Sequence, residues 1–199
     1  RFLMSSQKQA AQIMEKFWWH ASCTGVVAKA LTNKINQFFK EIEFIGGLLH
    51  DIGKLAMLQF DADKFMEVIR LVEEEGMLDI DAEKKVFGAD HLEVGEHIAK
   101  LWKLPSELTT IISRHNTPAD CENHNQLVAV VRFADILCEL WDAGIYEGLK
   151  AVDLEQEESV KVLKDSYPEL QEMDVEIFTM DLEIEFKKSS DFLNTIAGS

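Results

Sequence analysis

The sequence has few cysteines and little positive charge. Its three cysteines, Cys23, Cys121 and Cys138, form no C-x-x-C pair, which argues against a disulfide framework and against a thiolate zinc site. With 20 Lys and Arg against 36 Asp and Glu, the formal net charge is −16, and this charge repels nucleic acid polymers and anionic lipid heads. We therefore expect a cytoplasmic protein with no nucleic acid partner and no membrane partner.

Long apolar runs are also missing. No stretch approaches about 18 uncharged apolar residues, and no signal-peptide pattern opens the chain. The 199 residues are 47% hydrophobic, which is enough for one sizeable core, so we interpret residues 1–199 as a single domain. Because the chain begins at Arg1 and enters a helical pattern at once, we expect it to be a fragment of a longer protein.

Helix signals recur from end to end, and strand signals are scarce. "DADKFMEVIRLVEEEG" begins at a capping Asp61 and ends at Gly76, and "NQLVAVVRFADILCELWDAG" predicts a longer, central helix that closes near Gly144. "DLEIEF" alternates, yet the apolar residues around it follow helical spacing. The fold class is therefore all-α, a helical bundle with a C-terminal helical extension over residues 145–199. We expect the four tryptophans to anchor the core: Trp18, Trp19, Trp102 and Trp141.

Three polar residues fall on separate helices among apolar or small neighbours. They are His20, the His50 of a His50-Asp51 pair, and Asp135. Burying such groups is costly unless a partner compensates them, and a divalent cation suits a mixed set of imidazoles and carboxylates. Neighbouring helical residues point about 100° apart, so His50 and Asp51 would share an ion at the helix edge between them. Small residues in "ASCTGVVAKA" would let another helix approach near His20.

These residues carry a family resemblance. His20, "HDIGK" at 50–54 and Asp135 resemble the H…HD…D signature of the HD superfamily of metal-dependent phosphohydrolases. "FWWHASCTGVVAKAL", "GGLLHDIGKLAM", "VFGADHLEVGEHIAKLWKLPSELTTIISRHN" and "QLVAVVRFADILCE" resemble, in order and spacing, the HD-related output domain (HDOD), a bacterial signalling module. The similarity covers about Phe17 to Glu139, and an HDOD domain normally has a further helical segment before it.

The resemblance implies two readings of function. Many HDOD domains are regarded as non-catalytic output modules, whereas the related HD-GYP phosphodiesterases hydrolyse cyclic di-GMP. By resemblance, His91 and His115 fall where HD-GYP proteins place ligands of a second metal, or they contact phosphate. Lys16 stands where a glutamate ligand can occur, Asn116 replaces a second histidine, and no G-Y-P stretch follows. His97 and His124 match no ligand position.

We therefore expect a signal-transduction output domain with a retained HD metal site, and we keep a metal-dependent phosphohydrolase as the alternative. One ion, iron, manganese or zinc, with magnesium as a further option, would bind His20, His50, Asp51 and Asp135; two ions remain an option. If catalysis occurs, Asp51 would orient the attacking water and Lys54 would steady negative charge. The partner would be a signalling protein, or a phosphoester such as a cyclic dinucleotide.

Overall fold

The computed structural model describes residues 2–145, 147–148 and 152–197, and within them the fold is all-α with no strand. The elements are α1 (Phe2–Lys34), α2 (Ile42–Leu49), α3 (Ile52–Phe60), α4 (Ala62–Glu75), α5 (Asp79–Phe87), α6 (His91–Leu101), α7 (Ser106–Arg114), α8 (Asn125–Leu140), α9 (Glu158–Ser166) and α10 (Val175–Ala197), with 3-10 turns η1 (Pro118–Asp120) and η2 (Pro168–Leu170). The all-α prediction is confirmed.

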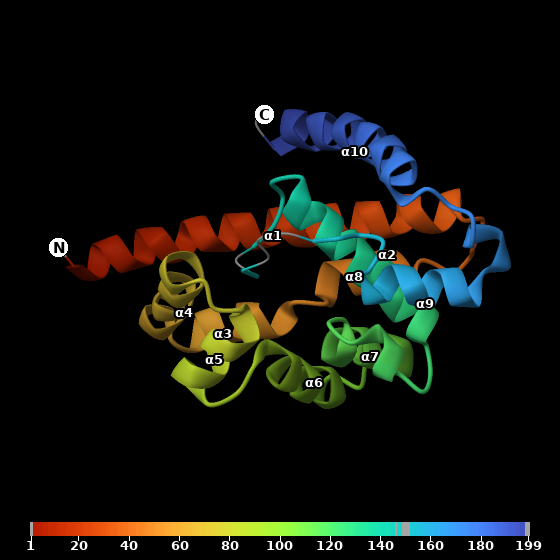
Figure 1. Ribbon diagram of the computed structural model, residues 1–199. Coiled ribbons are helices and arrows are strands. Elements are labelled where there is room, and N and C mark those ends of the chain that lie inside the picture. Colours follow the sequence, from red (N-terminus) through yellow and green to blue (C-terminus); the bar gives the residue numbers. More distant parts are fainter. Residues whose placement is uncertain (1, 146, 149–151, 198–199) are drawn as a thin grey trace.

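The long helix α1 spans the molecule, and α2, α3, α4, α8 and α10 pack against it (Figure 1). Its C-terminal half contacts α2, α8 and α10, while its N-terminal half lies over α3 and α4. The largest core cluster is built from α1, α8, α9 and α10. Helix α8 is buried along most of its length, as its apolar sequence predicts.

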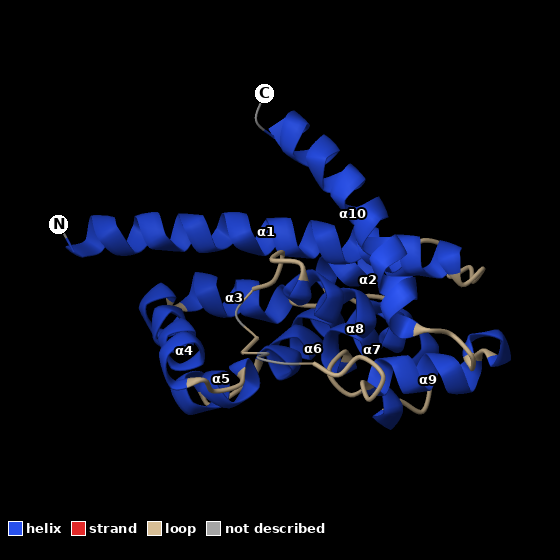
Figure 2. Cartoon of the chain, turned by 45° about the horizontal axis from the view of Figure 1, so that its top comes forward, coloured by secondary structure: helices blue, strands red, loops and turns tan. Residues whose placement is uncertain are grey.

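Helices α3 to α7 form a second layer beside α1 (Figure 2). Within it α3 packs on α6, α4 on α5, and α6 on α7. Asp61 accepts a hydrogen bond from the Lys64 backbone at the start of α4, and Gly76 ends that helix with a φ of 68°. The predicted start of this helix at Asp61 and its predicted end at Gly76 are therefore confirmed. Helix α8 ends at Leu140, earlier than the predicted end near Gly144.

Glycines allow the helices that carry polar residues to approach closely. A β-carbon at Gly47 would come within 2.6 Å of the Gly25 backbone, so α1 and α2 cross in contact. A β-carbon at Gly53 would overlap the His91 carbonyl oxygen, so α3 meets the start of α6. These two crossings bring His50 and Asp51 between His20 and His91. The predicted close approach at "ASCTGVVAKA" is confirmed.

Within the predicted 145–199 extension, α9, η2 and α10 are helical and the described residues between α8 and α9 are irregular, while residues 146, 149–151 and 198–199 lie outside the described residues. Trp141 stacks on Phe186 of α10 with ring centroids 5.3 Å apart, and Trp19 also packs on the main core. The prediction for the other two tryptophans was wrong, because Trp18 and Trp102 are 51% and 59% exposed. None of the described helices has the length and apolar character needed to cross a membrane.

Candidate metal centre

The predicted polar residues come together at one buried point. His20 lies on α1, His50 and Asp51 at the junction of α2 and α3, His91 at the start of α6, His115 at the end of α7, and Asp135 on α8. The side chains are at most 1% exposed. Helices distant in sequence therefore converge on a cluster of four imidazoles and two carboxylates.

The prediction that His50 and Asp51 are neighbours within one helix was wrong. His50 follows the last residue of α2, and Asp51 precedes the first residue of α3 with a φ of −99° and a ψ of 18°. The turn between the two helices aims both side chains into the cluster. Lys54, one turn along α3, is 3% exposed and places its ammonium 2.9 Å from Asp51 Oδ2.

Asp51 separates two groups of histidines. On one side, His20 Nε2 lies 3.2 Å from Asp135 Oδ1 and 3.3 Å from His50 Nε2, and His50 Nε2 lies 3.6 Å from Asp51 Oδ2. On the other side, Asp51 Oδ1 lies 3.5 Å from His91 Nε2 and 3.6 Å from His115 Nε2. The predicted first set of ligands and the predicted second pair thus share the Asp51 carboxylate.

Each histidine ring is oriented by its other nitrogen. The Nδ1 atoms of His20, His50 and His115 face the backbone carbonyl oxygens of Ala143, Gly47 and Ile111 at 2.9, 2.8 and 3.2 Å. His91 Nδ1 faces Glu83 Oε2 at 2.7 Å. An Nδ1 that donates to a carbonyl or carboxylate leaves a lone pair on Nε2. This is the arrangement that orients histidine ligands in metal sites.

Buried atoms without hydrogen-bond partners show whether the cluster suits a metal ion. Asp51 Oδ1, Asp135 Oδ1, His91 Nε2 and His115 Nε2 are buried without a hydrogen bond to any described residue, while Asp51 Oδ2 faces the Lys54 ammonium at 2.9 Å. Lone pairs of imidazole nitrogens face lone pairs of carboxylate oxygens, which is unfavourable unless a proton or a cation lies between them. Ligating atoms of His20, His50 and Asp135 lie within 4.8 Å of one another, as do those of His50, Asp51 and His115. The donor set fits a divalent ion.

Four charged residues of the cluster were not found from the sequence. Asp79 and Glu83 lie on α5, Arg132 lies on α8, and Glu147 follows α8. The Lys54 ammonium lies 2.9 Å from Asp79 Oδ2, and Arg132 Nη1 donates to Asp135 Oδ2 and Glu147 Oε2 at 2.8 and 3.0 Å. Arg132 is three residues before Asp135, and Asp79 is four before Glu83, so helical spacing could have revealed these pairs. No sequence pattern indicates that Glu147 belongs to the cluster.

The charges perturb one another strongly. Burial opposes ionisation of Asp51, but the Lys54 ammonium and the surrounding histidines outweigh it and hold the pKa of Asp51 well below its usual range. Burial also opposes the charge of Lys54, yet Asp51, Asp79 and Glu147 raise its pKa well above the ordinary value. Burial and the Asp135 charge raise the pKa of Glu147 well above that of an ordinary glutamate. Asp51 and Lys54 are therefore a fixed ion pair.

His91 is held in place by local structure. Asp90 caps α6 in a capping box with Glu93 and is paired with Lys84 at 2.9 Å. Glu83 Oε2 accepts hydrogen bonds from both the backbone N–H and the ring of His91 at 2.8 and 2.7 Å. The start of α6 and the α5 helix thus fix the position of His91 relative to Asp51.

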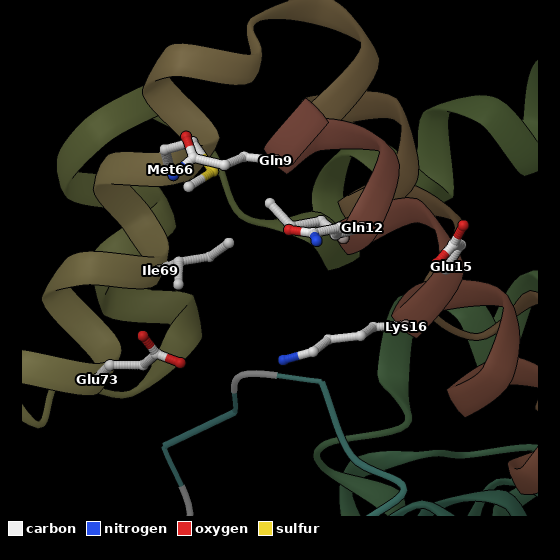
Figure 3. Close-up of a pocket in the computed structure, with 8 residues that line it drawn as sticks. Gln9, Gln12, Glu15, Lys16, Met66, Ile69 and Glu73 are labelled. Carbon is white, nitrogen blue, oxygen red and sulfur yellow. The ribbon is translucent and has the colours of Figure 1, made fainter. Parts of the chain in front are cut away.

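Lys16, His97 and His124, which match no ligand of the HD-GYP pattern, all lie outside the cluster. Lys16 is exposed on α1 and lines a groove of about 520 Å³ between α1 and α4, where its side chain and Glu73 extend toward one another (Figure 3). His97 is exposed, and His124 is half-buried with Nε2 3.4 Å from the Ser106 hydroxyl. Neither histidine belongs to the cluster.

The observed all-α bundle with an H…HD…D cluster matches the HD-superfamily signature that the sequence resembles. The family model for the HDOD domain matches residues 2–118, and the chain belongs to the HDOD family. The match begins before Phe17 and ends before Asp135, so its limits differ from the predicted Phe17–Glu139. Comparison with curated proteins finds no match.

Solved structures agree with this assignment. An HDOD domain protein with unknown function from Geobacter sulfurreducens has a TM-score of 0.69 and 30% identity, over 84% of this chain and 61% of that chain. The "Putative signal transduction protein" from Marinobacter aquaeolei VT8 gives 0.68 and 19%, over 94% and 38%. The "Putative phosphohydrolase" from Shewanella amazonensis SB2B gives 0.55 and 23%, over 77% and 59%. The chain spans less than two thirds of each of them.

Proposed function

We propose that this chain is an HDOD signal-transduction output domain whose buried centre binds one metal ion through His20, His50, Asp51 and Asp135. The observation that carries the proposal is the convergence of His20 Nε2, His50 Nε2 and Asp135 Oδ1 within 3.2–3.5 Å of one another. Iron, manganese or zinc suit this mixed set better than magnesium, which prefers oxygen ligands. The ion joins three helices that are distant in sequence.

A signalling role is favoured over catalysis by the way the cluster uses its cations. The Lys54 ammonium already faces three carboxylates, those of Asp51, Asp79 and Glu147. Arg132 is engaged by Asp135 and Glu147. A phosphoester entering this centre would therefore meet cations whose charge is already neutralised, in a chain with a net charge of −16.

Helix α10 offers a surface for the protein contact. Ile177, Met180 and Ile184 are 62%, 63% and 53% exposed at helical spacing, on a helix whose other face is buried against α1. The exposed carboxylate of Glu176 lies beside this row, as does that of Asp181, which is paired with Lys34 at 2.8 Å. An apolar row beside acidic groups fits a partner segment that is an amphipathic helix with basic side chains.

The partner proposal is tested with two synthetic amphipathic helical peptides that share one apolar face and differ only in carrying Lys or Glu on the other. Isothermal titration should show binding of the Lys peptide and none of the Glu peptide. Met180→Asp should abolish that binding without changing the melting temperature of the domain. Equal binding of both peptides, or binding that survives Met180→Asp, contradicts a basic partner on α10.

The phosphohydrolase alternative is supported by one observation. His91 and His115 face the second oxygen of Asp51 at 3.5 and 3.6 Å, so Asp51 is placed to bridge two ions. Bound metal would supply a Lewis acid and an acidified water. In that reading Asp51 orients the water, His91 and His115 hold a second ion or contact phosphate, and Lys54 faces the charge that develops on a phosphoester such as a cyclic dinucleotide.

Cyclic di-GMP separates the two functions. The domain, loaded with manganese or with iron, is incubated with the dinucleotide, and the linear product is quantified by chromatography. We expect slow or absent turnover. Rapid hydrolysis that Asp51→Ala abolishes and His97→Ala leaves intact would overturn the signalling proposal in favour of the phosphohydrolase.

A further inference from the structure

The segment after α8 crosses the metal centre. The Ala143 carbonyl accepts the Nδ1 hydrogen bond of His20 at 2.9 Å, and the Ile145 backbone N–H donates to Glu139 Oε1 at 2.5 Å. Farther along, the Glu147 carbonyl accepts from the Asp79 backbone N–H at 3.3 Å. The segment is therefore tied to α1, α8 and α5, and Glu147 has a defined position.

The Glu147 side chain points into the centre. It is 4% exposed, and Oε2 accepts from Arg132 Nη1 at 3.0 Å. Oε1 is buried and has no hydrogen-bond partner in the described part of the chain, with the Lys54 ammonium 4.0 Å away. Ligating atoms of Glu147, His20 and Asp51 lie within 4.8 Å of one another.

A half-satisfied carboxyl group in this position needs a proton or a cation. Asp51, Asp79, Glu83 and Asp135 contribute four more carboxylates to the same cluster, while Lys54 and Arg132 supply two positive charges. Leaving one oxygen of a buried carboxylate without a partner is unfavourable. One oxygen of Glu147 lies within 4.8 Å of possible ligand atoms of His20 and Asp51.

We propose that Glu147 is a further ligand of the ion. This inference rests on the proposed metal site of His20, His50, Asp51 and Asp135. A structural metal site is saturated by protein ligands, whereas a catalytic site keeps one position for water or substrate. With Glu147 as a ligand, fewer positions would remain for water or phosphate, which favours an ion that stabilises the fold over one that turns over a substrate.

The test counts water on the ion. The domain is loaded with manganese, and water-proton relaxation measures how many exchangeable waters each bound ion carries. Glu147→Ala should raise that number by about one relative to the unaltered domain, because one protein ligand is replaced by water. Inorganic phosphate should then bind to the manganese of the variant and displace this water, but leave the relaxation of the unaltered domain unchanged.

Two variants make the result specific. Glu147→Gln keeps the size of the side chain, and it should give the same increase if Glu147→Ala does not fold. Glu74→Ala removes an exposed carboxylate on α4, away from the cluster, and it should give no increase.

An unchanged water number in both Glu147 variants, or an equal increase in Glu74→Ala, overturns the role of Glu147 while the metal site stands. Failure of the unaltered domain to bind manganese, iron or zinc overturns the metal site itself, and this inference with it.

Discussion

His20 and His50 direct their Nε2 atoms at each other across 3.3 Å, and neither ring is free to turn away. His20 Nδ1 is held by the Ala143 carbonyl and His50 Nδ1 by the Gly47 carbonyl. With both Nδ1 atoms donating, the two Nε2 lone pairs oppose each other in a site without solvent. A metal ion that both nitrogens ligate removes this conflict, and Asp135 Oδ1 supplies a negative charge at 3.2 Å from His20.

Glu83→Ala should destabilise the domain, because Glu83 accepts hydrogen bonds from both the backbone and the ring of His91. Each buried donor left without an acceptor costs about 1–3 kcal/mol. Urea denaturation should show a lower midpoint with an unchanged slope. Glu74→Ala, which removes an exposed carboxylate from α4, should leave the midpoint where it is. Equal midpoints for Glu83→Ala and the unaltered domain would show that Glu83 does not hold His91.

Gly53→Ala should disturb the centre through the backbone. The new methyl group would overlap the His91 carbonyl oxygen, and forcing α3 and α6 apart costs about 1–3 kcal/mol or more. Because Gly53 is two residues from Asp51, we expect metal content to fall together with the melting temperature.

Gly88→Ala provides the comparison for Gly53→Ala. Gly88 has a φ of 82° but open space around it, so its substitution should lower the melting temperature and leave the metal content unchanged. Normal metal content in Gly53→Ala would mean that the α3–α6 contact does not position the ligands.

Asp135→Ala should remove the ion and the stability that it provides. Binding only the folded state contributes RT ln(1 + [L]/Kd), about 4 kcal/mol at a thousand times the dissociation constant. At roughly 2–4 °C per kcal/mol for a domain of this size, the melting temperature should fall on the order of 10 °C. A chelator should lower the melting temperature of the unaltered domain similarly and that of Asp135→Ala no further.

His97→Ala is the matched histidine control for Asp135→Ala, since His97 is exposed and outside the cluster. It should keep both the metal content and the response to the chelator. If the chelator lowers the melting temperature of the unaltered domain by only a degree or two, the ion does not join the helices.

Much of the centre could be predicted from the sequence, because His20, the His50-Asp51 pair and Asp135 stand out against apolar helices, and the family resemblance added His91 and His115. His20, His50, Asp135, His91 and His115 all belong to one cluster. The helical fold followed from caps and apolar spacing in the same way, as at Asp61 and Gly76.

The remaining parts depend on tertiary geometry that no local pattern carries. Glu147 lies in an irregular segment, and its burial arises only because that segment crosses the centre to reach Asp79. Trp18 and Trp102 are apolar enough for a core, yet Trp18 lies on an exposed face of α1 and Trp102 is exposed in the turn after α6. The turn between His50 and Asp51 was missed because "GGLLHDIGKLAM" is helical in pattern on both sides of it.

The most direct measurement is the metal content of the domain purified without a chelator, determined by elemental analysis on a known protein concentration. Asp51 Oδ1, Asp135 Oδ1, His91 Nε2 and His115 Nε2, which are buried without a hydrogen bond in the described part of the chain, predict about one tightly held ion of iron, manganese or zinc per chain. A value near two would mean that Asp51 bridges a second ion at His91 and His115. Clearly less than half an equivalent, with no uptake when these metals are supplied, would contradict the metal centre.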